Sequence, residues 1–471
     1  MNDRTKIARA HAGAARVCAA LIPVFAFAAC AKTEGTQAST DSTSSASSTP
    51  SSTTVCATDN GGITLPSGFC ASVFADTIGH ARHIVVNSNG DVYVNTWSGP
   101  YYQGATHPGG FIVALRDSNN DGKADIVKRF GPGVPQRNGG GTGIAIYQGA
   151  LYAEEGDTIA KRVVRYAISA DSIAPTSAKS ETIVAGLPAN GDHPMHPFVI
   201  DASGSIYMDI GSATNSCQAK NRTKDSPGRK PCTELQTRAG IWRYDANRTN
   251  QRFSPAERYA TGIRNAVGIA LDPGGQLYST QHGRDQLAEN WGKLYTPDQG
   301  QNLPAEELLK IEQGGDYGWP YCYYDNTQKL LVLAPEFGGD GGKIVGECSS
   351  KKPPAAFFPA HWAPDGLVFY NGASFPARYK GGAFIAFHGS WNRAPGPQQG
   401  YNVVFVPFTG GKPVDPSKYE IFADGFAGAN KQPDAAAHRP TSIAQGPDGA
   451  LYITDDKAGR VWRVVYKGPA R

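Results

Sequence analysis

One short pattern recurs six times along this chain: a turn containing Gly, followed by a run in which apolar residues alternate with others. The six copies are NSNGDVYVN (87–95), YQGALYAEE (147–155), DASGSIYMD (201–209), DPGGQLYST (272–280), YNGASFPARYKGGAFIA (370–386) and GPDGALYIT (446–454). Each copy fits a tight turn that leads into a half-buried strand of period two. Because an ordinary β-sandwich does not need a repeat sustained over this length, the pattern predicts an all-β, six-bladed β-propeller with four-stranded antiparallel blades.

The two ends of the predicted propeller are expected to meet in its last blade. The segment ITLPSGFCASVFAD (63–76) and the terminal segment GRVWRVVYKG (459–468) both have strand character. Strands from the two ends that share a blade would close the ring. One helical insert is expected at 300–311 (GQNLPAEELLKI), where polar residues flank an apolar stripe.

Residues 1–29 are predicted to be a lipoprotein signal peptide. Four basic residues precede the apolar stretch 18–29, which is too short to span a bilayer as a mature helix. The residues Phe27-Ala28-Ala29-Cys30 resemble a lipobox, with Cys30 as the acylated N-terminus. Phe is less usual than Leu at the first position of a lipobox, so ordinary signal-peptidase cleavage stays open.

Residues 30–56 are rich in Ser and Thr and are expected to form a flexible tether before a catalytic domain at 57–471. A tether directly after an acylation site predicts a periplasmic or cell-surface protein, anchored by lipid to a bacterial membrane. The chain carries a net charge of +4, of which +3 belongs to residues 1–29. A mature charge near +1 argues against nucleic acid as a partner.

The cysteine count supports the same compartment. Of eight cysteines, Cys18 would leave with the signal peptide and Cys30 would carry the lipid. The remaining six allow fifteen connectivities. We favour the sequential one: Cys56 with Cys70, Cys217 with Cys232, and Cys322 with Cys348. Disulfides are typical of an oxidising compartment, whereas a metal or haem site would call for the CxxC or CxxCH motif that this sequence lacks.

Seven motifs together resemble the glucose/sorbosone dehydrogenase family, which includes pyrroloquinoline quinone (PQQ)-dependent sugar dehydrogenases and L-sorbosone dehydrogenases. In chain order they are GHARHIVVNSNGDVYVNTWSG, GDHPMHPF, GIRNAVGIALDP, QHGRDQL, GGDYGWP, FIAFHGSWNRAP and HRPTSIAQGPDGALYITDD. The resemblance covers roughly residues 62–468. It implies oxidation of an aldose or sorbosone-type sugar that depends on PQQ and calcium, with a separate acceptor for the electrons.

The resemblance assigns the general base to His193, which lies in GDHPMHPF directly before a predicted strand. A neutral imidazole can take a hydroxyl proton while hydride leaves the same carbon for the quinone. His196 lies three residues further on and competes for the same role.

The resemblance also implies which residues contact the quinone. PQQ carries three carboxylates, so a site for it needs fixed cations and hydrogen-bond donors. Arg264 and Asn265 match the pair that contacts the quinone in the family, and Arg393 and Arg439 are the other expected cationic contacts. An ordinary surface arginine in a loop is the alternative for Arg393 and, less strongly, for Arg264.

Two calcium sites are expected. By resemblance, the backbone carbonyls of Gly283 and Arg284 in QHGRD would hold the catalytic ion. Independently, DSNNDGKAD (117–125) matches the first nine positions of an EF-hand-type loop, although Lys128 stands where the twelfth-position carboxylate belongs. The expected ligands of this structural site are the side chains of Asp117, Asn119, Asp121 and Asp125 and the carbonyl of Lys123. An acidic turn without metal is the alternative.

The sequence departs from the better-known soluble glucose dehydrogenases near the base. Pro197 and Phe198 stand where those proteins carry a Gly-Gly-Arg run, and Ser212 stands where they have a strand-end Asp. These departures leave the sugar unnamed. His361, Trp362 and Trp391 are further candidates to line the cleft as sugar-stacking or quinone-stacking surfaces, with core packing as the alternative for the tryptophans.

Two other functions stay open at this point. One is a calcium-dependent propeller lactonase, which would hold its metal with converging acidic and Asn side chains. The other is a non-catalytic sugar-binding propeller, for which the His and Arg motifs would be incidental.

Overall fold

A computed structural model describes residues 55–98, 109–133, 139–156, 159–175 and 179–468. These residues belong to one compact unit, residues 52–471. The predicted signal peptide, Cys30 and almost all of the predicted tether lie outside the described residues. Within the described ranges, no helix is long and apolar enough to cross a membrane.

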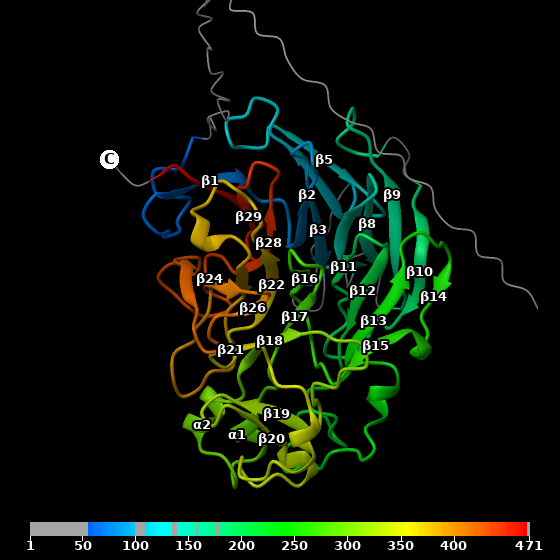
Figure 1. Cartoon of the computed structure of the whole chain (residues 1–471), viewed down its shortest axis with the longest axis vertical. Helices are drawn as coiled ribbons and strands as arrows, with labels where there is room; N and C mark the ends of the chain where they lie inside the picture. Colours follow the sequence, from blue (N-terminus) through cyan, green and yellow to red (C-terminus); the bar gives the residue numbers. More distant parts are fainter. Residues whose placement is uncertain (1–54, 99–108, 134–138, 157–158, 176–178, 469–471) are drawn as a thin grey trace, which may run out of the picture. The chain divides into compact units, whose positions relative to one another are not determined.

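Six antiparallel sheets form the six blades of a β-propeller, as the repeat predicted (Figure 1). The first strands are β2 (Ala81–Val86), β7 (Ile144–Tyr147), β11 (Phe198–Ile200), β16 (Ile269–Leu271), β22 (Pro364–Phe369) and β28 (Pro440–Gln445). The second strands are β3 (Val92–Ser98), β8 (Ala150–Gly156), β12 (Ser205–Ile210), β17 (Leu277–Gln281), β23 (Ala383–Phe387) and β29 (Leu451–Asp455).

The outer strands complete each blade. The third strands are β4 (Ile112–Arg116), β9 (Lys161–Ala167), β13 (Gly240–Asp245), β18 (Glu306–Lys310), β24 (Asn402–Val406) and β30 (Val461–Tyr466). The fourth strands are β5 (Ile126–Phe130), β10 (Glu181–Leu187), β15 (Arg258–Thr261), β21 (Ala356–Phe358), β27 (Glu420–Ala423) and β1 (Phe69–Ala75). Two short strands extend this frame: β14 (Gln251–Arg252) pairs with β10, and β6 (Gly139–Gly140) pairs with β3.

Each copy of the sequence repeat spans the connection from the first to the second strand of a blade. The six first strands lie in a ring, each in contact with the first strands of the two neighbouring blades. They line a central cavity of about 370 Å³, to which all six contribute residues. Each copy of the repeat therefore encodes the turn and the second strand that directly follow a wall strand of the central channel.

The ring closes as expected, because β1 pairs antiparallel with β30 in the blade that also contains β28 and β29. All three sequential disulfides are present: Cys56–Cys70, Cys217–Cys232 and Cys322–Cys348. The prediction of the disulfide connectivity is thus confirmed.

The prediction of a helix at 300–311 is wrong. Helix α2 (Pro297–Asn302) ends before this segment is half complete, and residues 306–310 form β18. Leu303 precedes Pro304, and the residue before a proline is disfavoured in the helical region. Strand β18 pairs with both β17 and β21, so pairing inside the blade overrides the helix preference of Glu and Leu.

Extra elements beside blade four form a cap, which we define as α1 (Leu287–Asn290), α2 and the hairpin of β19 (Cys322–Asp325) with β20 (Leu330–Leu333). They gather together at the lower end of Figure 1. The cap has an apolar core of its own, built from Leu287, Tyr295, Leu303, Tyr323, Val332 and Ala334. A second small hairpin, β25 (Phe408–Thr409) with β26 (Lys412–Pro413), joins β24 to β27.

Candidate functional site

The strand order gathers the predicted base, the predicted quinone contacts and the predicted ligands of the catalytic calcium at one end of the propeller. In an antiparallel blade, the loop after the second strand and the connection into the first strand lie at the same end. We call this the site end. His193, Arg264, Asn265 and Arg439 precede first strands, whereas Gly283, Arg284 and Arg393 follow second strands.

The predicted calcium loop at 117–125 lies between β4 and β5, which places it at the opposite end. Its carboxylates accept hydrogen bonds from within the loop: Asp117 from the backbone N–H groups of Asp121 (3.2 Å) and Gly122 (2.8 Å), and Asp125 from Ser118 N–H (2.9 Å). The hydrogen bonds that the side chain and the backbone of Ser118 donate to Asp125 lower the pKa of its carboxyl group. Calcium binding here stays a prediction, and any ion held there would be remote from the site end.

His193 is fixed in a form suited to accept a proton. Its Nδ1 lies 2.9 Å from the carbonyl oxygen and 3.0 Å from Oγ of Ser212, whose hydroxyl itself donates to Thr214 O. Since a carbonyl can only accept, Nδ1 carries the hydrogen and Nε2 is the basic atom. Burial, and secondly the Arg264 guanidinium, lower the pKa of His193 well below 6.5, so the ring is neutral at pH 7.

His196, the competing candidate, has a different environment. Its Nδ1 lies 3.0 Å from Oε1 of Glu154, and its backbone N–H donates to Oε2 of the same carboxylate. Lys161 Nζ lies 3.5 Å from Glu154 Oε1. Although burial opposes it, Lys161 and His196 lower the pKa of Glu154, so the carboxylate is ionised. His196 therefore belongs to a buried ion pair network between blades, and the geometry favours His193 as the base.

Arg264 is held firmly by the protein itself. Its Nε and Nη2 donate to the carbonyl (3.0 Å) and Oδ1 (2.9 Å) of Asn215, Nη2 also pairs with Asp285 Oδ2 (2.9 Å), and Nη1 donates to Gly283 O (3.1 Å). Four of the five N–H groups of the guanidinium are thereby engaged. Arg264 fixes the surrounding loops and has one Nη1 hydrogen left for a ligand.

Arg264 is linked to the candidate base through Ser212. The backbone N–H of Ser212 donates to Arg264 O (2.8 Å), while Ser212 O and Oγ hold His193. Beside it, Asn265 is buried, and its Oδ1 has no hydrogen-bond partner among the described residues. A buried, unpartnered amide oxygen next to this chain of contacts is typical of a place where a ligand binds.

The charges of Arg393 and Arg439 are only partly compensated in the described part of the chain: Asp298 acts electrostatically on Arg393, and Arg439 acts on Asp456. Arg393 donates to Gln301 O (2.7 Å), and Arg439 donates to the carbonyls of His388 (3.1 Å) and Gly389 (2.8 Å). Carbonyls hold the two side chains in place without neutralising them, and among the described residues neither forms an ion pair with Asp or Glu. Such arginines suit an anionic ligand.

The carbonyls predicted to hold the catalytic calcium follow β17. Gly283 O already accepts from Arg264, and the side chain of Arg284 turns away into a buried pair with Glu336 (2.5 Å). Glu306 Oε2 accepts from Gly283 N–H (2.9 Å), and burial raises the pKa of Glu306 to about 7. No group of three or more His, Cys, Asp or Glu side chains in the described ranges is arranged to hold a metal. Ligation by the backbone stays a prediction.

Sequence reasoning missed a second charged cluster at the site end, which we call the Arg82 cluster. Arg82 Nη1 lies 2.6 Å from Asp456 Oδ2 and 3.4 Å from Asp365 Oδ2. His388 Nε2 lies 2.7 Å from Asp456 Oδ1, and His282 Nε2 lies 3.1 Å from Asp365 Oδ1. Four of the five residues occur in motifs quoted above, so their signal was present; Asp365 occurs in none of them.

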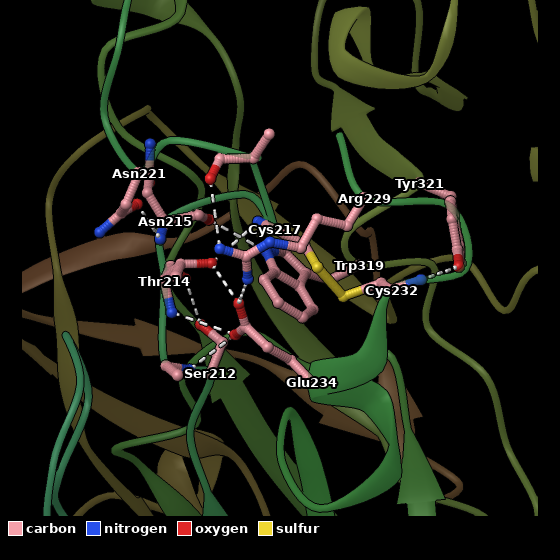
Figure 2. The surroundings of a disulfide bond; sticks show 12 residues. Ser212, Thr214, Asn215, Cys217, Asn221, Arg229, Cys232, Glu234, Trp319 and Tyr321 are labelled. Atoms are coloured by element: carbon pink, nitrogen blue, oxygen red, sulfur yellow. Dashed lines mark hydrogen bonds and ion pairs between the residues drawn. A yellow bond between two sulfur atoms is a disulfide. The ribbon is translucent and has the colours of Figure 1, made fainter. Parts of the chain in front are cut away.

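The loop that supports Arg264 is itself cross-linked by a disulfide. It joins β12 to β13 and contains the Cys217–Cys232 disulfide, shown in Figure 2. Glu234, in the short 3-10 helix Thr233–Gln236, accepts from the backbone N–H groups of Ala213 (2.8 Å) and Thr214 (3.1 Å). The indole of Trp319 also donates to Asn215 O (3.1 Å; Figure 2). The disulfide thus fixes the segment that positions Asn215.

We expect the double variant Cys217→Ala/Cys232→Ala to lose stability and ligand affinity together. Opening a loop of this length costs about 3 kcal/mol of unfolding free energy, and a looser Asn215 should weaken anion binding at Arg264. Thermal denaturation and PQQ titration would measure the two effects. Cys56→Ala/Cys70→Ala is the matched control, because the sequence separations are 15 and 14 residues and Cys70 lies in β1, on the outer edge of blade six. Equal loss of PQQ affinity in both variants would contradict the prediction.

A family model described as TrAA12-like matches residues 63–467. The chain belongs to the TrAA12-like family. Curated relatives of this TrAA12-like chain include the following three proteins. It is 24% identical over 350 residues to the "Pyrroloquinoline quinone-dependent sugar dehydrogenase" of Hypocrea jecorina (strain QM6a), covering 68% of this chain and 74% of the relative. It is 28% identical over 233 residues to the "Pyrroloquinoline quinone-dependent pyranose dehydrogenase" of Coprinopsis cinerea, covering 43% of this chain and 30% of that protein.

The third relative is an "Uncharacterized protein" of Borreliella burgdorferi, 30% identical over 223 residues, or 46% of the TrAA12-like chain and 51% of the relative. The chain thus spans about half of that protein and less of the Coprinopsis enzyme. Among solved structures, an iodide structure of a Trichoderma reesei protein of carbohydrate-active enzymes family AA12 has a TM-score of 0.67 at 19% identity, covering 86% and 98% of the two chains. The resemblance to PQQ-dependent sugar dehydrogenases, drawn from the motifs, is confirmed at the level of the family.

Proposed function

We propose that this chain is a PQQ- and calcium-dependent sugar dehydrogenase that oxidises an aldose or a sorbosone-type sugar. The observation that carries the proposal is the state of His193, which is neutral, oriented through Nδ1 by Ser212 and linked by Ser212 to Arg264. The names of the Hypocrea and Coprinopsis relatives support the choice of cofactor.

The residues at the site end fit a tricarboxylate quinone. Arg393 and Arg439 supply positive charge that no ion pair among the described residues neutralises, Arg264 supplies its remaining Nη1 hydrogen, and Asn265 supplies a buried amide. When bound, PQQ would accept the hydride, and a calcium ion on the Gly283 and Arg284 carbonyls would act as a Lewis acid.

The chain's own contribution to the reaction is to remove a proton. Nε2 of His193 takes the proton of the sugar hydroxyl, or of a hydrated carbonyl, as hydride leaves the same carbon. Ser212 holds the ring in the tautomer that leaves Nε2 basic. Arg264 and burial keep the imidazole uncharged until it has taken the proton.

The test is reconstitution of the purified protein with PQQ and calcium, followed by dye reduction across a panel of aldoses and sorbosone. We expect cofactor-dependent visible absorbance and sugar-dependent dye reduction that chelation of calcium suppresses. If neither signal appears with any sugar, the proposed dehydrogenase function is refuted. Lactone hydrolysis in the same preparation would instead indicate the propeller lactonase. We favour the dehydrogenase over the lactonase, because a lactonase would hold its metal with acidic side chains. The carboxylates Asp365 and Asp456 instead pair with Arg82 and His side chains.

The low pKa of His193 predicts an unusual pH profile for kcat/KM. A general base fails only below its own pKa, so the acidic limb should lie well below pH 6.5. Ser212→Asp would place a carboxylate beside Nδ1, raise the pKa of His193 and move this limb upward by about one to two pH units. Ser212→Ala keeps the carbonyl contact and is the control. An acidic limb that is the same in all three proteins would exclude His193 as the titrating base.

We also propose that the protein is exported and held on a bacterial membrane by lipid on Cys30, with 30–56 as the tether. The disulfides support an oxidising compartment. A separate electron acceptor would then reoxidise the quinone at the cell surface or in the periplasm. Metabolic labelling with a fatty acid analogue, in the wild type and in Cys30→Ser, tests the anchor.

A further inference from the structure

Almost all aromatic side chains in the described part of this protein are buried or partly buried. The chain contains 19 Phe, 21 Tyr and 7 Trp. In the described part of the chain, Trp391 is the one aromatic side chain that is exposed, with 52% of its surface open to solvent. The other two stacking candidates are buried: Trp362 packs in the core of blades four and five, and His361 Nε2 contacts Gly300 O (2.9 Å).

Trp391 lies at the rim of the candidate site. It occupies the loop after β23, two residues before Arg393. The next residue, Asn392, donates from Nδ2 to Asp285 Oδ1 (2.8 Å), and the other oxygen of that carboxylate pairs with Arg264. One peptide unit therefore separates the exposed indole from the polar contacts that hold the site together.

The loop that carries Trp391 is held by a dense set of hydrogen bonds. Ser390 N–H donates to Gln399 O, and Gln399 N–H donates to Ser390 Oγ, both at 2.8 Å. Gln398 accepts from Ser390 Oγ (2.6 Å) and from Arg393 N–H (3.2 Å), and its own Nε2 donates to Arg393 O (2.9 Å). The indole is thus presented on a rigid support, so little conformational entropy would be lost when a ligand packs on it.

We propose that Trp391 is a stacking platform for a second sugar unit, so that the substrate class includes oligosaccharides whose terminal unit occupies the site beside His193. This inference rests on the proposed sugar dehydrogenase function. The apolar face of a pyranose can cover an indole while its hydroxyls stay in water, which removes apolar surface from solvent without burying unpaired polar groups.

A sugar ring fits this surface better than a protein partner does. Stable protein interfaces bury roughly 800 Å² on each side around several anchors. Trp391 is a single large apolar side chain, and its neighbours Asn392, Gln398 and Gln399 are polar and partly exposed. Polar amides around one aromatic face are suited to hydroxyl groups at the edge of a sugar ring.

The first experiment measures binding without quinone, by calorimetry and Trp fluorescence on the full-length protein. The probes are glucose with cellobiose and cellotriose, and xylose with xylobiose and xylotriose. In at least one series, we expect affinity to rise about tenfold from one unit to two, with quenching of Trp emission. Trp391→Ala should remove this increment and Trp391→Phe should retain most of it. Val414→Ala, which truncates another exposed apolar side chain in the hairpin connection of β24 to β27 at the opposite end, should leave the increment intact.

The second experiment measures dye reduction by the holoenzyme. Trp391→Ala should lower the ratio of kcat/KM for the disaccharide to that for the monosaccharide about tenfold. Equal affinity for one and two units in every series, or an increment that survives Trp391→Ala, would overturn the inference even if sugars are oxidised. An increment that depends on Trp391 without dye reduction by the wild type would support the platform and refute the dehydrogenase.

Discussion

Replacing His193 by Ala is expected to lower kcat about a thousandfold while leaving PQQ absorbance largely unchanged. General acid–base catalysis by a positioned side chain contributes about 10² to 10⁴ in rate. The loss should fall on kcat, because Nε2 acts on the reacting hydroxyl, whereas the positive charges expected to bind the quinone belong to Arg264, Arg393 and Arg439. Steady-state dye reduction and titration with PQQ would separate the two effects.

His196→Ala is the matched control for this prediction. Removing His196 leaves Glu154 with Lys161 but without its imidazole partner, so the variant should melt at a lower temperature. Its kcat, measured below the melting transition, should fall far less than that of His193→Ala. The opposite ranking of the two variants in kcat would show that His196 is the base.

Arg82→Met is expected to destabilise the fold by about 3 to 5 kcal/mol, because it leaves buried carboxylates without their cation. Arg82 extends from β2 in blade one to Asp365 in blade five and to Asp456 in blade six. The two carboxylates are 4% and 0% exposed, so water cannot replace the guanidinium. Chemical denaturation would measure the loss. Arg378→Met is the control, since its pair with Glu420 is largely exposed and should contribute about 1 kcal/mol or less.

The same pair of carboxylates fixes the sign of the pH dependence. Although burial opposes it, Arg82 with histidines lowers the pKa of Asp365 and Asp456 far below the usual value near 4. In the wild type, this contribution to stability is therefore complete above about pH 4 and is lost as pH falls through the folded-state pKa values. Without Arg82, the pKa values of both carboxylates rise from their wild-type values. Protonation of the carboxylates at low pH then reduces the destabilisation of the variant. The stability gap should be larger at pH 7 than at pH 4; a constant gap would show that Arg82 acts through packing alone.

The architecture could be predicted because its signal is local and repeated. A Gly turn and an alternating strand occupy about nine residues, and six copies suffice to count the blades. The strand β18 could not be predicted, because Glu306, Glu307 and the leucines after them favour a helix until β17 and β21 pair with them. Local preference decided the prediction, and long-range pairing decided the structure.

The candidate site was predicted in part for a related reason. His193 and Arg264 lie in compact motifs, so each could be found from a few neighbouring residues. Their partners could not, since Ser212, Asn215 and Asp285 lie between 19 and 49 residues away from the groups they hold. The sequence therefore predicted Arg264 as a ligand contact, whereas the structure shows that most of its donors fix the loops. Among the described residues, Arg264 pairs with Asp285, whereas Arg393 and Arg439 form no ion pair with Asp or Glu.

The disulfide at the start of the folded unit has a mechanical consequence. A pull transmitted along the segment before Val55 reaches Cys56, whose covalent link to Cys70 passes the load straight into β1. The turns between residues 57 and 69 are bypassed and carry almost no tension. Strand β1 is hydrogen-bonded along its length to β30, so the force is spread over a whole strand pair. A pull applied through the proposed tether would therefore have to separate β1 from β30 before the propeller could unravel from its N-terminal end.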